Sequence, residues 1–206
     1  MNMLKFSLMV LFKPMDAFPL IKAERDKFSY RPAIILLLMM IIVRTVYIYV
    51  VHYPLADILP RDASIWLEIV KYLLPVLTWV LACYAVTTII SGESMMREIF
   101  MASAYALLPY IVFTLPIGLL SHLLGNGETG IYGVLQKAIW MWVFILIFIS
   151  VMTMNSYEFG QTVGICVLSV IAMILIWGIA GLFFALGNQL YRFLYDIAIE
   201  LRMLRS

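Results

Sequence analysis

Five apolar segments, each about as long as a membrane-spanning helix, constrain this chain more than any other feature. A helix needs about 20 apolar residues to cross a hydrocarbon core of about 30 Å, because lipid cannot hydrogen-bond exposed backbone groups. Hydrophobic residues make up 65% of the chain, well above the roughly 45–50% of soluble domains. We therefore predict an all-α polytopic membrane protein with about five transmembrane helices. The predicted spans are Ala33–Val51, 65–90, Met101–Leu124, 138–154 and Ile165–Leu186.

The rest of the composition argues against enzymatic chemistry and bound cofactors. A net charge of +2 is too small to hold nucleic acid electrostatically, and no metalloprotease, phosphate-loop or nucleophile-elbow motif occurs. Cys83 and Cys166 lie in apolar segments, where cysteine acts as a small hydrophobic residue. His52 and His122 each stand alone at a span end, which is typical of interfacial side chains rather than metal ligands. We expect no catalytic activity, no cofactor, no metal and no nucleic-acid partner, with membrane lipid as the surroundings.

Short connections between the spans indicate one membrane domain over residues 1–206. Its parts are a cytoplasmic or interfacial segment (1–32), a transmembrane core (33–186) and a C-terminal amphipathic helix (187–206). The first part holds a short apolar run broken by Lys13-Pro14, which is typical of a helix lying in the headgroup plane. The last part either docks a partner or ends the fold on the membrane surface. Its apolar stripe is Leu190, Phe193, Leu194, Ile197, Leu201 and Leu204.

Basic residues near the first span set the predicted orientation, because cytoplasmic loops carry an excess of Lys and Arg. Six precede the span and the loop after it has only Arg61, which predicts a cytoplasmic N-terminus. Five full spans leave seven basic residues inside and five outside, a weak bias. If segment 101–124 is instead a re-entrant hairpin, Lys137 and the C-terminal arginines move inside, and the ratio becomes eleven to one. The side of the C-terminus therefore stays open.

Three charged residues lie within the first two predicted spans. Arg44 lies about eight residues before the outer end of the first span, at a depth where an unpaired arginine costs about 2.5–3.5 kcal/mol. Glu68 and Lys71 lie one to two turns into the second span from the same side. One hypothesis is an Arg44–Glu68 pair that locks the two spans together or faces another protein. The alternative is that Arg44 snorkels outward.

Helix-breaking and small residues mark the later spans. Pro109 and Pro116 lie seven residues apart in the third span and predict a helix kink or a re-entrant turn. Gly178 and Gly181 leave part of the fifth span thin enough for close helix packing. The chain shows no internal repeat, and so few spans could hardly enclose a substrate path, which favours a subunit of a larger assembly.

The stretch SGESMMREIFMASAYALLPY, from Ser91 to Tyr110, resembles the Yip family of integral membrane proteins. Gly92 in the loop, Tyr105 in an Ala-Tyr-Ala-Leu run and Pro109 carry the likeness, and an opening Phe-Lys-Pro-x-x-Ala-Phe motif adds to it. Eukaryotic members have a long soluble region and an Asp-Leu-Tyr-Gly-Pro-like signature before the first span. The 32 residues before the first predicted span have neither, so the resemblance is to the bacterial branch.

This resemblance implies five spans, a cytoplasmic N-terminus in a bacterial cytoplasmic membrane, and no established catalytic residues. Bacterial members are expected to accompany transport machinery such as ABC-type sugar importers. We therefore expect an accessory or scaffold subunit that associates with other integral membrane proteins, with ABC transporter permease subunits as candidates. One alternative is a small-solute or lipid transporter acting as a homo-oligomer, and another is a membrane-shaping protein acting through its interfacial helices.

Overall fold

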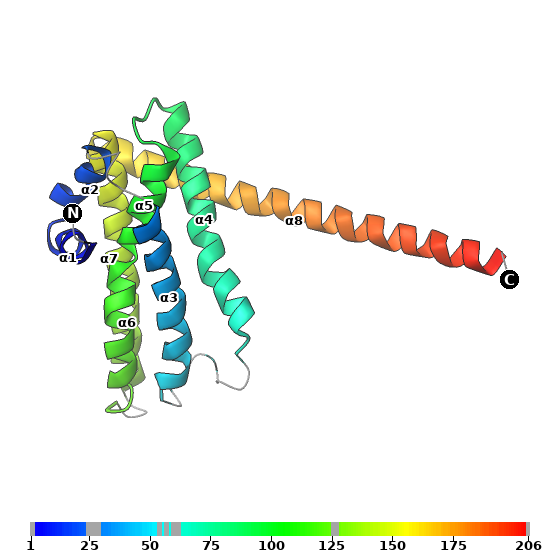
Figure 1. Cartoon of the computed structure of the whole chain (residues 1–206), viewed down its shortest axis with the longest axis horizontal. Coiled ribbons are helices and arrows are strands. Elements are labelled where there is room, and N and C mark those ends of the chain that lie inside the picture. Colours follow the sequence, from blue (N-terminus) through cyan, green and yellow to red (C-terminus); the bar gives the residue numbers. More distant parts are fainter. Residues whose placement is uncertain are drawn as a thin grey trace.

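The protein is a helical bundle from which one long helix projects, as Figure 1 shows. The computed structural model describes residues 3–23, 30–52, 55, 58, 63–124 and 128–204, so Arg61 of the orientation argument lies outside the described residues. The helices are α1 (Met3–Phe12), α2 (Pro14–Ala23), α3 (Arg31–Val50), α4 (Ile65–Ile89), α5 (Met96–Ala106), α6 (Leu108–Leu120), α7 (Thr129–Asn155) and α8 (Phe159–Leu204).

The predicted all-α fold with five long apolar segments is confirmed. The described residues contain five helical stretches long and apolar enough to cross a bilayer, with α5 and α6 together forming the third. The spans α3, α4, α6 and α7 run alongside one another in Figure 1. The five candidate spans are Arg31–Val50, Ile65–Ile89, Met96–Leu120, Thr129–Asn155 and Phe159–Tyr195.

The third span is interrupted at Leu107, between α5 and α6. Pro109 occupies the first turn of α6 and has no N–H to donate to the carbonyl four residues earlier, in α5. The helical hydrogen bonding is therefore interrupted here, and the break falls at Leu107, two residues before the proline. Pro116 lies inside α6 without ending it, because neighbouring groups in a membrane helix can compensate for the lost bond.

The broken third span still passes from one end of the bundle to the other. Just before α5, the Ser94 amide donates to Asn155 Oδ1 at the end of α7. Just after α6, the hydroxyl of Ser121 accepts from the His52 amide at the end of α3 (2.9 Å). Figure 1 shows these points at opposite ends of the bundle. A re-entrant hairpin would bring both ends of the segment to the same end, so the structure favours a full crossing.

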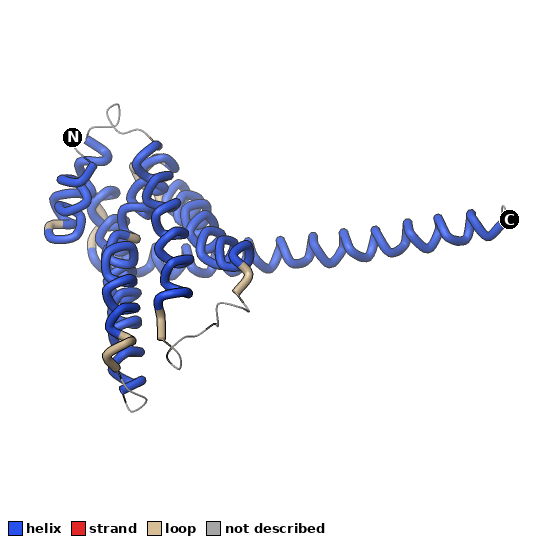
Figure 2. Tube along the Cα trace, turned by 60° about the horizontal axis from the view of Figure 1, so that its bottom comes forward, coloured by secondary structure: helices blue, strands red, loops and turns tan. Residues whose placement is uncertain are grey.

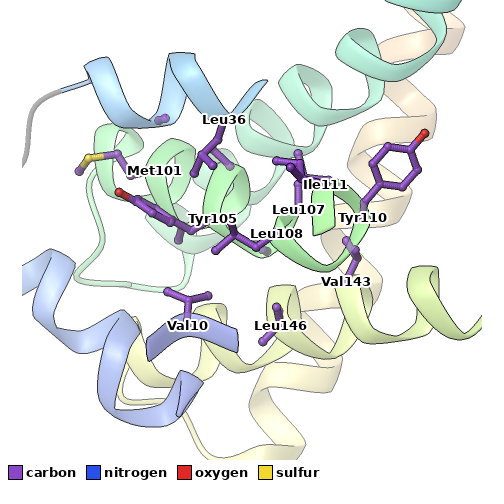
Figure 3. Packing of buried hydrophobic residues seen from close by; sticks show 14 of the residues in the cluster. Val10, Leu36, Met101, Tyr105, Leu107, Leu108, Tyr110, Ile111, Val143 and Leu146 are labelled. Atoms are coloured by element: carbon purple, nitrogen blue, oxygen red, sulfur yellow. The ribbon is translucent and has the colours of Figure 1, made fainter. Parts of the chain in front are cut away.

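The N-terminal segment folds back against the bundle as two helices, with the chain breaking at Lys13, where Lys13-Pro14 predicts a break. One face of this pair is buried, and Figure 3 shows Val10 directed toward the same core as Tyr105 and Leu146. The N-terminal helices therefore help to build the core as well as bordering it. Their fully covered apolar side chains are Phe6, Val10, Ala17, Phe18 and Ile21.

The fifth span and the C-terminal amphipathic segment form one helix, α8, so the break expected before Gly187 is absent. Glycine inside a helix costs only about 1 kcal/mol relative to alanine, and no proline follows to end the helix. In Figures 1 and 2, α8 crosses α4 and then extends beyond the other helices. Only 11% of the residues in its apolar 18-residue stretch are buried, whereas 61% are buried in the corresponding stretch of the third span.

The third span occupies the centre of the bundle. Every side chain from Met101 to Ile111 is buried, and Figure 3 shows this segment between α3, α7 and the N-terminal helices. The Tyr105 ring meets the Phe6 ring edge to face, with centroids 4.8 Å apart. This central position explains why an Ala-rich run suits α5, since small side chains let the neighbouring helices approach it closely.

Candidate functional site

An ion pair inside the bundle joins the first two spans. Arg44 of α3 and Glu68 of α4 are 6% and 7% exposed, and Arg44 Nε donates to Glu68 Oε2 at 2.7 Å. Lys71, one turn further along α4, lies with its Nζ 3.8 Å from Glu68 Oε1 and is itself largely exposed. The structure thus brings the three predicted intramembrane charges together. With so little of Arg44 exposed, it does not snorkel to the surface.

Two aromatic rings face the guanidinium of Arg44, and two more pack next to them. Its Cζ lies 5.0 Å from the Tyr72 ring centroid and 5.4 Å from that of Tyr47, within the range of cation–π attraction. Trp140 of α7 packs against both Tyr72 and Tyr110, with centroids 6.2 and 5.2 Å away. The charge of Arg44 is therefore stabilised by one carboxylate and by the faces of two phenol rings.

A network of hydroxyl and amide groups continues from this cluster toward α7. The hydroxyls of Tyr47 and Tyr132 lie 2.6 Å apart, and Gln136 Nε2 donates to the Tyr47 hydroxyl at 3.0 Å. Thr114 of α6 is only 1% exposed, and its Oγ1 has no hydrogen-bond partner among the described residues. A buried hydroxyl without a partner costs about 1–3 kcal/mol, so Thr114 marks an incomplete polar site.

These side chains border a cavity of about 420 Å³ between α3, α4, α6 and α7. The volume falls in the usual range for ligand pockets, roughly 300–1,000 Å³. The cavity extends from Arg44 to the loop end of the bundle at Leu55 and Thr129. Among the residues that the structure describes, no group of three or more His, Cys, Asp or Glu side chains could hold a metal ion.

At the opposite end of the bundle, Gly92 lies where two loops touch. A Cβ at this position would come within 2.5 Å of the Tyr157 hydroxyl and 2.9 Å of the Thr87 carbonyl oxygen. The amide of Ser94 donates to Asn155 Oδ1 at 3.1 Å in the same contact. Burial, together with Cys83 and Glu93, raises the pKa of the Tyr157 phenol, so its hydroxyl stays protonated. The missing side chain of Gly92 therefore lets the loop before α5 come close to the loop after α7.

We expect Gly92→Ala to destabilise the protein by about 1–3 kcal/mol, because an inserted methyl group would press on a backbone carbonyl as well as on Tyr157. Adding Tyr157→Phe removes one of the two crowding oxygens and is expected to recover part of the loss. Gly164→Ala is the matched control, since nothing lies within 4 Å of a Cβ there and the change improves helix propensity. Thermal unfolding in detergent measures all three; equal stability of the Gly92 and Gly164 variants would refute the close-approach role.

The other residues of the family-like motif hold the centre of the fold. Tyr105 fills the core against Phe6, and Pro109 lies beside the break in the third span. Lys22 of α2 forms an ion pair with Glu93, which fastens the N-terminal helices to the loop that contains Gly92. The motif Gly92, Tyr105 and Pro109 is therefore explained by packing and chain direction.

None of the described residues packs against the glycines of the fifth span. Gly178 and Gly181 are exposed on α8, and nothing lies within 4 Å of a Cβ placed on either. Trp177, just before them, still donates from Nε1 to Thr78 Oγ1 of α4 at 3.1 Å. Close helix packing at Gly178 and Gly181 therefore stays a prediction, and the packing partner would be a helix of another chain.

Some contacts of the site have no clear signal in the sequence. His52 and His122 look isolated along the chain, yet their rings lie 5.3 Å apart, and His122 Nε2 is 2.7 Å from the Val50 carbonyl oxygen. The tyrosines that line the cavity come from four separated helices. The one available hint is that Tyr47 lies three residues from Arg44 and Tyr72 lies four residues from Glu68, which is about one helical turn in each case.

A family comparison agrees with the likeness carried by the loop and third span. The model of the Yip1 domain matches residues 8–182, which covers most of the chain. No curated protein and no solved structure matches the sequence.

Proposed function

Because the chain belongs to the Yip1 domain family of generally non-catalytic, multi-pass membrane proteins, we propose that it acts by associating with other integral membrane proteins. Its role would be that of an accessory or scaffold subunit in a bacterial cytoplasmic membrane, with a cytoplasmic N-terminus. An ABC-type sugar importer, through its permease subunits, is the candidate partner. The single observation that supports association is the unpaired surface of α8.

The helix α8 is longer than one membrane crossing requires. The helix has 46 residues, which is about 69 Å at 1.5 Å per residue, more than twice a bilayer core. Every residue whose exposure is described from Trp177 onward is exposed. Large apolar side chains are exposed along this part of the helix, which suits burial against another membrane helix. They include Leu182, Phe183, Phe184, Leu186, Leu190 and Phe193.

Association in lipid requires close packing rather than hydrophobic exclusion, because lipid tails are as apolar as leucine. The exposed half of α8 has the required shape near Gly178 and Gly181, where small residues let a second backbone approach. Of the five spans, α8 has the smallest buried share, 11%, whereas the third span is 61% buried by its own neighbours. A partner that packs along α8 would therefore add contacts that the single chain does not make.

We expect the double variant Leu182→Ser and Phe184→Ser to lose co-purifying membrane proteins in mild detergent. These side chains are 66% and 79% exposed, so their loss removes packing surface from α8 without opening the core of the bundle. Phe113→Ser on α6 is the control, because Phe113 is also exposed and lies on another span. Identification of the co-purifying chains by mass spectrometry is the measurement. Recovery of this chain alone from native membranes, together with transport in liposomes, would contradict the proposal.

That result would favour the second candidate, a small-solute or lipid transporter acting as a homo-oligomer. The observation that supports it is the cavity beside Arg44, which opens within the bundle and contains buried polar groups. A transporter usually also shows paired broken helices in two related halves. The sequence shows no internal repeat, so association with other proteins remains the better-supported proposal.

A further inference from the structure

The cavity between α3, α4, α6 and α7 has a composition that favours an anionic ligand. Arg44 and Lys137 border it, and none of the described residues that line it is acidic. Glu68 lies outside the lining and neutralises Arg44 through Nε, so Lys137 supplies the excess positive charge. Lys137 is exposed and stands on α7 one residue after Gln136, at the side of the cavity.

Hydrogen-bond donors converge on the same space. The buried Thr114 hydroxyl has no partner among the described residues, and the Gln136 amide and Tyr132 hydroxyl lie on the wall formed by α7. Figure 3 shows the Tyr110 ring extending away from the core side chains around Leu107 and Leu108. A ligand oxygen that accepted from Thr114 would remove one unmet polar cost in this part of the protein.

The beginning of α7 adds a third attraction for negative charge. Thr129 and Gly133, in the first turns of α7, line the cavity, and helix N-termini carry a partial positive charge from unpaired amide groups. The residue before the helix, Glu128, makes no side-chain cap bond to these amides, and it is exposed and absent from the lining. Thr114 of α6 lines the same cavity, and its buried hydroxyl has no partner among the described residues, which is a second observation independent of the helix end.

Aromatic faces complete the cavity. Trp140 and Tyr72 stack with their ring planes 26° apart, and both border the space next to Arg44. Such faces pack well against a carbon skeleton attached to an anionic group. From this combination we propose that the cavity binds a phosphate group carried on a small organic skeleton, either an anionic lipid headgroup or a soluble phosphate ester. This binding goes beyond the association through α8 and involves different residues.

The experiment compares the purified chain in nanodiscs of phosphatidylcholine alone with nanodiscs containing equal parts of phosphatidylglycerol and phosphatidylcholine. Native mass spectrometry counts the lipid molecules that remain bound, and sn-glycerol 3-phosphate is added as a soluble competitor. We expect phosphatidylglycerol, but not phosphatidylcholine, to be retained. Displacement by the competitor would identify the headgroup phosphate ester as sufficient, whereas retention despite the competitor would identify the lipid as the source.

Two variants assign this binding to the cavity. Lys137→Gln is expected to weaken phosphatidylglycerol retention about tenfold or more, the usual effect of losing a hydrogen bond to a charged group. Thr114→Val keeps the side-chain shape, leaves the unfolding midpoint unchanged or higher, and is expected to weaken binding about fivefold.

The controls are matched in residue type. Lys13→Gln removes an exposed charge on the far side of the chain, and Thr153→Val removes a hydroxyl of α7 that already bonds the Ile149 carbonyl. Both are expected to bind as the wild type does. Equal retention of the two lipids, or undiminished binding by Lys137→Gln and Thr114→Val, would overturn the proposal. Loss of co-purifying proteins in the α8 variant has no bearing on this result, so the two proposals fail separately.

Discussion

Replacing Glu68 with leucine is expected to lower the free energy of unfolding by about 3–5 kcal/mol, the usual cost of removing one partner of a buried ion pair. Arg44 would keep its charge, because a guanidinium stays protonated in proteins, and its Nε would lose the carboxylate at 2.7 Å. The Tyr47 and Tyr72 rings would still face it, but cation–π contacts offer only about 0.5–2 kcal/mol. The predicted loss is therefore close to the full cost of the uncompensated charge.

The reverse substitution, Arg44→Leu, is expected to cost less. Glu68 would retain Lys71, whose Nζ is 3.8 Å from Oε1. The double variant Arg44→Leu with Glu68→Leu removes both buried charges and is expected to recover most of the stability, because well-packed apolar pairs often match buried ion pairs. Lys71 is largely exposed and remains solvated in that variant.

Unfolding by SDS in mixed micelles, followed by tryptophan fluorescence and circular dichroism, gives the three stabilities and the coupling energy. The order expected from least to most stable is Glu68→Leu, Arg44→Leu, then the double variant. A coupling energy near zero would show that the pair contributes nothing to holding the first two spans together. Lys71→Gln serves as a charge control at the same helix end, and its effect is expected to stay within about 1 kcal/mol.

Tyr105→Ala is expected to be the second large change, with a loss of about 3–5 kcal/mol from removing a fully buried aromatic ring. Tyr105 is 1% exposed at the centre of the third span, and its ring packs edge to face on Phe6. The cavity left behind would lie between α5 and the N-terminal helices. These helices are therefore expected to detach before the rest of the bundle unfolds.

Limited proteolysis near Lys13 and Lys22 measures this detachment alongside global unfolding. Tyr105→Phe keeps the ring and is the matched control, with most of the stability expected to remain. A cycle that combines Phe6→Ala with Tyr105→Ala should give a coupling of about 0.5–1.5 kcal/mol for the ring pair. Wild-type resistance to proteolysis in Tyr105→Ala would show that the N-terminal helices are held elsewhere, for example by the ion pair between Lys22 and Glu93.

Span positions could be predicted because lipid restricts the backbone to helices of a certain length. The predicted segments Ala33–Val51 and 65–90 agree with α3 and α4 to within a few residues, and Lys13-Pro14 marks the observed break between α1 and α2. The likeness to the Yip family rests on a local motif, which a comparison over residues 8–182 supports. In these cases a local physical requirement acts on consecutive residues.

The misjudged or missed features depend on contacts between distant residues. A glycine such as Gly187 weakens a helix without ending it, so local propensity could not decide where α8 stops. The choice between a crossing and a re-entrant third span depended on Asn155 and Ser121, which meet loops at opposite ends of the bundle. The pairing of His52 with His122 depends on which spans are neighbours, and the hydrophobic periodicity of the sequence does not show this.

The sequence by itself determined that this chain is helical, that it belongs in lipid, and that its membrane charges are few. These properties follow from the cost of placing backbone and charged groups in hydrocarbon, which every residue meets individually. Only the tertiary structure decided that Arg44 meets Glu68, that tyrosines from four helices enclose a cavity, and that α8 leaves its surface unpaired. Those outcomes depend on how helices pack against each other, and packing depends on side-chain shapes that lie far apart in the chain.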